Sequence, residues 1–148
     1  MNVEEVIKTA KPIPLEKRTL IHLMLVHNKV NEAITSALKP YEVSSQQFNV
    51  LRILRGQKGC PANLSTLNER MVSKMSNTTR LVDKLIQKGY VRREICETNR
   101  RKVEITITDS GKKMLDEMDR VMDSTEQQLV EGFSTKELEQ LNYLLDKF

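Results

Sequence analysis

The spacing of apolar residues changes near Gly89, and this change limits the folds open to the chain. Apolar residues within 81–86 recur three and four positions apart, which is typical of one face of a helix. Residues 90–95 and 103–108 are rich in β-branched side chains and follow the period of a strand, and the polar stretch 97–102 lies between them. The sequence therefore predicts a helix that leads directly into a two-stranded hairpin.

Further helices are predicted before this unit. Residues 15–38 carry apolar side chains at helical spacing and predict one long amphipathic helix, which Lys39-Pro40 ends. Ser44 and Gln47 fit a capping box, so a shorter helix is predicted from there to Gly56.

A pair of short helices is predicted immediately before the hairpin. Thr66 and Glu69 fit a capping box for a helix that ends near Met71. Ser73 is the expected cap of the next helix, and Gly89 is expected in the left-handed conformation that ends it. Two helices that meet across a few residues and lead into a hairpin form a winged helix-turn-helix.

The C-terminal part of the chain predicts two more helices. Residues 108–111 offer several caps for a long helix that runs toward Phe133. Ser134 and Glu137 fit another capping box, and leucines at helical spacing follow it up to Phe148. Both ends of the chain are therefore expected to be helical.

Charge is distributed unevenly along the chain, whose net charge is +4. Residues 65–108 carry 10 basic and 5 acidic side chains, whereas residues 109–148 carry 5 basic and 10 acidic ones. A basic centre suits a polyanion such as nucleic acid, and the acidic end would be held away from it. Charges that only solvate helix faces are the alternative that this distribution leaves open.

The predicted fold is mainly α with a small β-hairpin wing, in the α+β class. Terminal helices of roughly twenty residues extend about 30 Å and cannot bury their apolar stripes against so small a centre. Because only 39% of the residues are hydrophobic and 4% are aromatic, we expect a second copy to complete the core. The expected units are an N-terminal dimerisation arm at 1–38, a winged helix-turn-helix DNA-binding lobe at 39–110 and C-terminal dimerisation helices at 111–148.

Several other classes of protein are excluded by what the sequence lacks. It has no apolar run long enough to span a membrane, and residues 1–11 do not form a signal peptide, so a cytoplasmic protein is expected. Cys60 and Cys96 have no metal-ligand or disulfide pattern around them and are expected to be reduced thiols. Because nucleophile and nucleotide-binding motifs are absent, neither enzymatic activity nor a cofactor is expected.

Polar residues cluster where the helix before the hairpin begins. The first turns of a recognition helix face base edges in the major groove, where Asn can pair with adenine and Arg with guanine. Helix capping by the hydroxyl groups is the structural alternative. The expected base-reading residues are Ser76, Asn77, Thr78, Thr79 and Arg80.

The tip of the predicted hairpin is strongly basic. Arg100, Arg101 and Lys102 repel one another and add nothing to the fold, whereas a narrow minor groove attracts such side chains. A solubilising loop is the alternative. Lys74 and Lys84 flank the start of the helix or lie on it, and are expected to contact phosphates.

Residues 79–93 resemble the recognition helix and first wing strand of the MarR family of bacterial winged helix-turn-helix regulators. Residues 99–111 are similar to the family's Asp-x-Arg wing motif, its Leu-Thr strand end and the glycine that starts the next helix. The resemblance covers essentially the whole chain. Asn99 stands where the family has Asp, which reduces the anchoring of Arg101 to a neutral hydrogen bond.

The resemblance implies roles for two wing-related residues. Arg101 is expected to enter the minor groove, and Asp83 is expected to orient it by bonding between the recognition helix and the wing. An ordinary partner on the same helix, such as Gln87, is the alternative for Asp83.

The resemblance also implies an effector pocket between the helical arms and the lobe. A small aromatic or phenolic effector would fit such a pocket, although methionines at helical spacing are also typical of a core. His27 lies on the apolar stripe and is expected in a core or an interface. The candidate pocket residues are His22, Asn28, Phe48, Arg52 and Met114.

Together these features predict a homodimeric, sequence-specific DNA-binding transcriptional regulator. We expect a repressor that reads a pseudo-palindromic operator in double-stranded DNA and that a small-molecule effector releases. Three alternatives stay open: a winged-helix module that docks a protein, an architectural DNA-binding module without ligand response, and a small-molecule or metal binder with vestigial DNA affinity. The polar start of the recognition helix argues against the first, and the basic wing argues against the last.

Overall fold

The computed structural model describes residues 1–73, 77–95 and 103–148. Its fold is mainly helical with one antiparallel two-stranded hairpin, as the sequence predicts. The expectations for Lys74, Ser76, Cys96, Arg100, Arg101 and Lys102 lie outside the described residues. In chain order the elements are α1 (Val3–Val6), α2 (Leu15–Leu38), the 3₁₀ helix η1 (Lys39–Tyr41), α3 (Ser45–Gly56), α4 (Leu64–Arg70), α5 (Thr78–Gln87), β1 (Val91–Ile95), β2 (Val103–Ile107), α6 (Asp109–Val130) and α7 (Thr135–Leu145).

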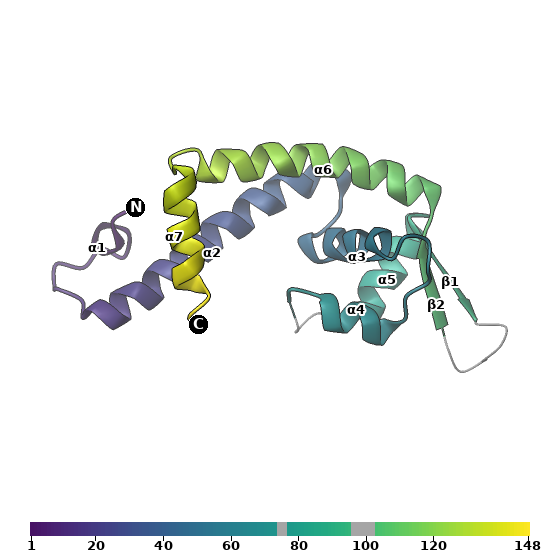
Figure 1. Ribbon diagram of the computed structural model, residues 1–148, viewed down its shortest axis with the longest axis horizontal. Helices are drawn as coiled ribbons and strands as arrows, with labels where there is room; N and C mark the ends of the chain where they lie inside the picture. The colour runs from purple at the N-terminus through teal and green to yellow at the C-terminus, as the bar shows by residue number, and fades with distance from the viewer. Residues whose placement is uncertain (74–76, 96–102) are drawn as a thin grey trace.

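The molecule consists of a lobe and a pair of long helices that extend from it (Figure 1). Helices α3, α4 and α5 form the lobe with the hairpin at its outer edge, and α6 leads from β2 back along α2 (Figure 1). Helix α7 turns back at the far end of α6, and α1 lies at the free end of α2 (Figure 1). None of the helices within the described ranges has both the length and the apolar character that crossing a membrane requires.

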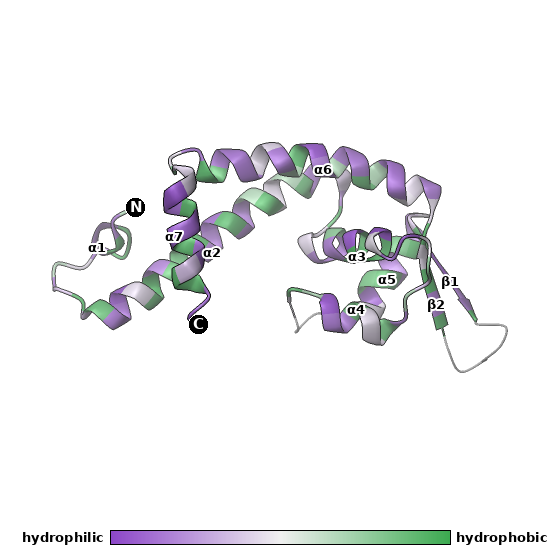
Figure 2. Cartoon of the chain, viewed as in Figure 1, coloured by the Kyte–Doolittle hydropathy of each residue, from purple (hydrophilic) through white to green (hydrophobic). Residues whose placement is uncertain are grey.

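The hydrophobic core lies in the lobe, where helices from both halves of the chain meet. Helices α3, α5 and α6 and strand β2 contribute its fully buried side chains, and Leu38 closes it at the end of α2. Along α2 and α6, apolar and polar turns alternate (Figure 2). The central buried residues are Val50, Leu51, Leu67, Val82, Leu85, Ile105, Leu115 and Met118.

Helix caps confirm two predicted boundaries. The hydroxyl of Ser44 accepts a hydrogen bond from the backbone N–H of Gln47, and the Gln47 side chain accepts one from the Ser44 backbone N–H. Ser134 and Glu137 form the same reciprocal box at the start of α7, and the hydrogen bond from the Ser134 hydroxyl holds the pKa of Glu137 below its usual range.

Two other predicted caps were wrong. Asn63, and not the Thr66–Glu69 pair, caps α4, because its side-chain oxygen accepts from the Thr66 backbone N–H at 2.9 Å. Asn77, and not Ser73, caps α5 by accepting from the Arg80 backbone N–H at 3.2 Å. An asparagine is as good an N-cap as serine, so the pattern alone did not distinguish these positions.

The hairpin joins the lobe through a third short segment that the sequence did not predict. Strands β1 and β2 pair from Val91 opposite Ile107 to Ile95 opposite Val103. Ala62, in the loop before α4, forms a bridge to Ile105 through hydrogen bonds of 2.9 and 2.7 Å. The base of the wing is therefore fixed to the helix-turn-helix by backbone bonds.

The start of α6 approaches the start of β1 closely. Gly89 adopts φ +73° and ends the segment after α5, as predicted, and the Thr108 hydroxyl donates to its carbonyl oxygen at 2.7 Å. A Cβ atom placed on Gly111 would lie 2.1 Å from the backbone oxygen of Tyr90 and 2.9 Å from Cγ1 of Ile107. Only glycine fits at this junction of wing and arm.

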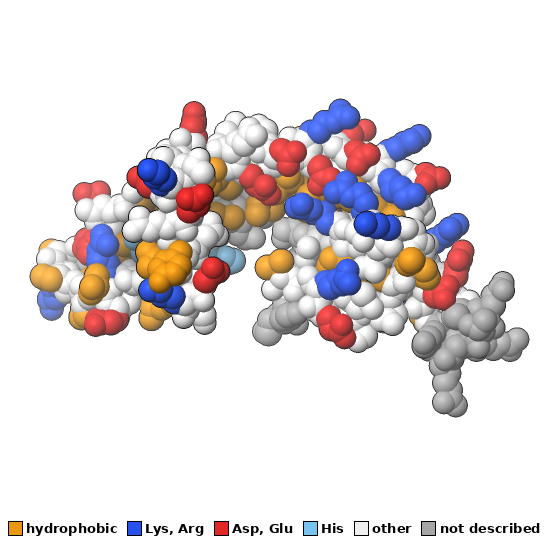
Figure 3. Space-filling view, in the orientation of Figure 1, with side chains coloured by type: hydrophobic (Ala, Val, Ile, Leu, Met, Phe, Trp, Pro, Cys, Tyr) orange, Lys and Arg blue, Asp and Glu red, His pale blue; other side chains and the backbone are white. Residues whose placement is uncertain are grey.

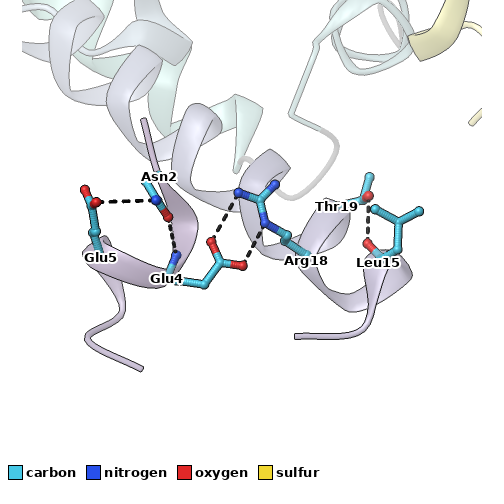
Figure 4. Close-up of polar contacts among 6 residues, drawn as sticks. All are labelled: Asn2, Glu4, Glu5, Leu15, Arg18 and Thr19. Atoms are coloured by element: carbon cyan, nitrogen blue, oxygen red, sulfur yellow. Dashed lines mark hydrogen bonds and ion pairs between the residues drawn. The ribbon is translucent and has the colours of Figure 1, made fainter. Parts of the chain in front are cut away.

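A short N-terminal helix that the sequence did not predict is held on α2 by an ion pair (Figure 4). Nε of Arg18 donates to Glu4 Oε1 at 2.8 Å, and Nη2 donates to Oε2 at 3.2 Å. This two-point bond holds the pKa of Glu4 below its usual range. Val3 is buried beside it, whereas Asn2 caps the helix.

Gly111→Ala should lower the free energy of unfolding by about 1–3 kcal/mol, because the added methyl group forces α6 away from Tyr90. Gly56→Ala is the matched control, since a Cβ at the end of α3 meets nothing within 4 Å. Urea unfolding at one fixed protein concentration compares the two variants with the wild type. Equal stability of the two variants would show that the junction tolerates a side chain.

Candidate nucleic-acid interface

Helix α5 presents a continuous polar face to solvent. Its buried residues are Thr78, Val82 and Leu85, which face the lobe core. The exposed residues follow at the spacing of the opposite side of a helix, and all of them are polar or charged. They are Thr79, Arg80, Asp83, Lys84 and Gln87.

The first turn of α5 is fixed to α4, which changes the role of one predicted base-reading residue. Thr78 is only 5% exposed, and its hydroxyl donates a hydrogen bond to Oδ1 of Asn68. A buried hydroxyl in such a bond cannot reach a base edge, so the expectation for Thr78 was wrong. It instead sets how α5 leaves the turn, while Thr79 and Arg80 stay exposed beside it.

Asn77 also has a structural task. Its side-chain oxygen is used in capping α5, as the alternative interpretation of these residues anticipated. Ser76 and Lys74 lie outside the described residues. Among the base-reading candidates that the structure describes, Thr79 and Arg80 therefore have side chains directed away from the lobe.

Asp83 connects the recognition helix to the wing, but through a residue that the sequence analysis did not choose. Nη2 of Arg93, in β1, lies 2.5 Å from Oδ1 of Asp83. In the described part of the chain its partner is therefore Arg93, and not Gln87 of the same helix. Arg101, the expected partner, lies outside the described residues. The pairing was missed because strand register decides which wing arginine faces α5.

The neighbouring Arg92 interacts within the hairpin itself. Its Nε donates to the Thr106 hydroxyl at 3.1 Å and lies 3.7 Å from Oε1 of Glu94. In the ranges that the structure describes, Arg80 and Lys84 form no ion pair, so both charges on the α5 face are available to phosphates or bases.

Basic residues on the other side of the lobe are largely neutralised. Arg55 of α3 lies 2.5 Å from Asp119 and 3.1 Å from Asp116, both on α6. Arg52 lies 4.0 Å from Asp119. Red and blue side chains lie close together over α3 and α6 (Figure 3). The acidic C-terminal region therefore offsets α3, whereas the α5 face keeps two cations against one paired carboxylate.

A cavity of about 470 Å³ lies between the arm helices and the lobe. Of the expected pocket residues, Phe48 and Arg52 line it, and the Arg52 guanidinium lies 5.6 Å from the centre of the Phe48 ring. His22, Asn28 and Met114 do not line it, and Met114 instead packs against the core. The remaining lining residues are His27, Val30, Asn31, Ile34, Ser45, Gln46, Asn49, Met71, Val72, Ser73, Met122 and Glu126.

His27 differs from its predicted environment. It was expected in a core or an interface, but in the single chain it is exposed and borders this cavity. His27, Val30, Asn31 and Ile34 lie on one face of α2 at helical spacing, which was the signal that identifies this wall. The other walls come from distant parts of the chain, so no local pattern marks them.

Comparison with known proteins identifies the family. The MarR family model matches residues 43–103. Over 121 residues the chain is 30% identical to the HTH-type transcriptional regulator PecS of Dickeya dadantii (strain 3937), covering 80% of this chain and 72% of PecS. The chain belongs to the MarR family. The apo structure of MarR from E. coli is 26% identical, with a TM-score of 0.70 over 93% of this chain and 97% of that one.

The fold also occurs in a solved ligand complex. CouR from Rhodococcus jostii RHA1, bound to p-coumaroyl-CoA, is 24% identical, with a TM-score of 0.76 over 90% of this chain and 93% of CouR. MarR-family membership confirms the predicted winged helix-turn-helix fold and a DNA-binding transcriptional regulator. Since the matching relatives are regulators, it also confirms that the chain is not an enzyme.

Thr78→Val should lower the free energy of unfolding by about 1 kcal/mol, because it removes a buried hydrogen bond to Asn68. Thr79→Val is the matched control: it makes the same change one residue later, on the exposed face, and should stay within about 0.5 kcal/mol of the wild type. Thermal and urea unfolding measure both. Identical losses would contradict the anchoring role of Thr78.

Proposed function

We propose that this MarR-family regulator is a homodimeric repressor that binds a pseudo-palindromic operator through α5. The observation that carries the proposal is the construction of the α5 start. Thr78 is tied into the lobe, while Thr79 and Arg80 beside it project from a rigid support. A helix so held presents its first turn to base edges in the major groove.

Uncovered apolar side chains on the arm helices support the dimer. Helix α7 has no buried residue, and Leu141 and Leu144 are 40% and 48% exposed. Leu20 and Met24 on α2 are 56% and 66% exposed. Such a surface is large for a monomer, and the same helices of a second copy would cover it.

The proposed dimer gives each part of the chain a task. Residues 1–38 and 111–148 form the dimerisation arms, and residues 39–110 form the DNA-binding lobe. Two α5 helices would then lie about 34 Å apart, one turn of B-DNA, which matches an inverted repeat. By binding there, the dimer would block access of the transcription machinery to the promoter.

The side chains on the α5 face have distinct roles in this proposal. Arg80 contacts guanine O6 and N7, and Thr79 contacts a neighbouring base edge. Lys84 neutralises a phosphate, while Asp83 holds the wing through Arg93. Arg100, Arg101 and Lys102, outside the described residues, stay predicted minor-groove and phosphate contacts.

The cavity between arm and lobe is the proposed effector site. Its walls combine apolar side chains such as Ile34 and Met122 with Phe48, and Arg52 and His27 add polar groups. This lining suits a small aromatic or phenolic molecule that carries a polar group. CouR, which shares the fold, binds p-coumaroyl-CoA. A ligand between arm and lobe would change the spacing of the two α5 helices and lower operator affinity.

An architectural role without sequence preference is the second candidate. Its support is the basic centre of the chain, since charge alone gives non-specific DNA binding. The exposed Thr79 and Arg80 favour sequence-specific binding instead, because phosphate contacts do not require such a polar helix start.

Selection of genomic fragments by the purified protein tests these alternatives. At about physiological salt, the wild type should enrich a few fragments that share an inverted repeat, and sequencing identifies it. Arg80→Ala should weaken binding to these fragments by about 1–3 kcal/mol and relax the base preference at one position of each half-site. Lys84→Ala should weaken binding to all fragments about equally.

Arg120→Ala is the control for this selection, because Arg120 lies exposed on α6 away from the α5 face. It should leave the enriched set unchanged. Uniform, salt-sensitive recovery of all fragments by the wild type would contradict the operator proposal and favour the architectural role.

A further inference from the structure

The chain between α4 and α5 leaves α4 at a well-anchored residue. Met71 is 3% exposed, and its backbone N–H bonds to the Leu67 carbonyl oxygen at 2.9 Å. Its ψ of 133° takes the chain out of the helical conformation. The next residue, Val72, has a side chain that is 88% exposed, so packing does not hold it.

A side chain from α3 holds Val72 instead. Oδ1 of Asn49 accepts a hydrogen bond from the Val72 backbone N–H at 3.2 Å. Asn49 is half-buried and lies between the buried Phe48 and Val50, which fix α3 in the core. The bond therefore connects the rigid centre of the lobe to the first exposed residue of the turn. Asn49 and Val72 also both line the cavity, so this contact lies where the cavity meets the turn.

The second end of the same connection is held separately. Thr78, the first residue of α5, bonds to Asn68 of α4. Asn68 fixes the entry into α5 relative to α4, whereas Asn49 fixes the exit from α4 relative to α3. Because α5 must meet base edges within hydrogen-bond distance, a small displacement of either end changes its fit to DNA.

We propose that Asn49 is a positioning residue for operator recognition, acting through the Val72 backbone to set the place of α5 on the lobe. This inference rests on the proposed function, since it needs α5 to read DNA. Asn49 itself touches no DNA in this account. Its acceptor oxygen is the group that matters, and a carboxylate at the same position supplies that oxygen without a change of shape.

Four variants test this inference on the operator found by fragment selection. Asn49→Ala removes the acceptor, and Gln46→Ala truncates a neighbouring cavity residue that, in the described ranges, makes no hydrogen bond to the turn. Asn49→Asp keeps the acceptor, and Gln46→Glu adds the same charge one helical turn earlier. Operator affinity is measured well below the unfolding temperature, together with amide hydrogen exchange at Val72 by NMR.

Asn49→Ala should weaken operator binding about three- to tenfold, the range that one lost hydrogen bond supports, and should speed exchange at the Val72 amide. Asn49→Asp should restore slow exchange and bind as Gln46→Glu does, and Gln46→Ala should bind as the wild type does. A role in stability alone would change unfolding without changing operator affinity.

Two results would overturn the inference, and they differ from failure of the proposed function. The first is operator binding by Asn49→Ala equal to that of Gln46→Ala. The second is Asn49→Asp binding as weakly as Asn49→Ala while Gln46→Glu binds normally. If the wild type selects no operator, the proposed function fails first, and the positioning role fails with it.

Discussion

One row of buried side chains on α6 connects every functional part of the molecule. Gly111, Leu115, Met118 and Met122 recur at three- and four-residue steps and are all buried. The row begins against the Tyr90 carbonyl at the base of the wing and ends beside the cavity that α2 also lines. The wing, the lobe and the arm therefore cannot move independently of α6, so a change at the arm is transmitted to the DNA-binding face.

The same helix shows why one chain is not a complete unit. Beyond Met122 the apolar side chains of α6 are no longer fully covered, and Val130 and Phe133 are 40% and 49% exposed. Helix α7, which follows, has no buried side chain in the single chain. In our account a second copy covers this surface, and the resulting geometry sets the distance between the two recognition helices. Arm packing and operator spacing would then be two consequences of one interface.

The sequence predicted those elements whose signal is periodic and local. The bounds 15–38 for the first long helix agree with α2, and the hairpin and its alternation were also correct. Contacts between elements were not predictable in this way. Whether Thr78 faces DNA or Asn68 depends on the angle between α4 and α5, and whether Asp83 meets Arg93 depends on strand register. The cavity was predicted only at Phe48 and Arg52, because its walls come from separate segments of the chain.

Sedimentation equilibrium of the protein at micromolar concentration tests the central claim most directly. Our account predicts a wild-type particle of twice the chain mass. Leu141→Glu should be monomeric and lose operator affinity, because the charge enters the α7 stripe. Lys136→Glu, on the far side of the same helix, should stay dimeric. A monomeric wild type, or a Leu141→Glu variant that stays dimeric and binds normally, would contradict the account.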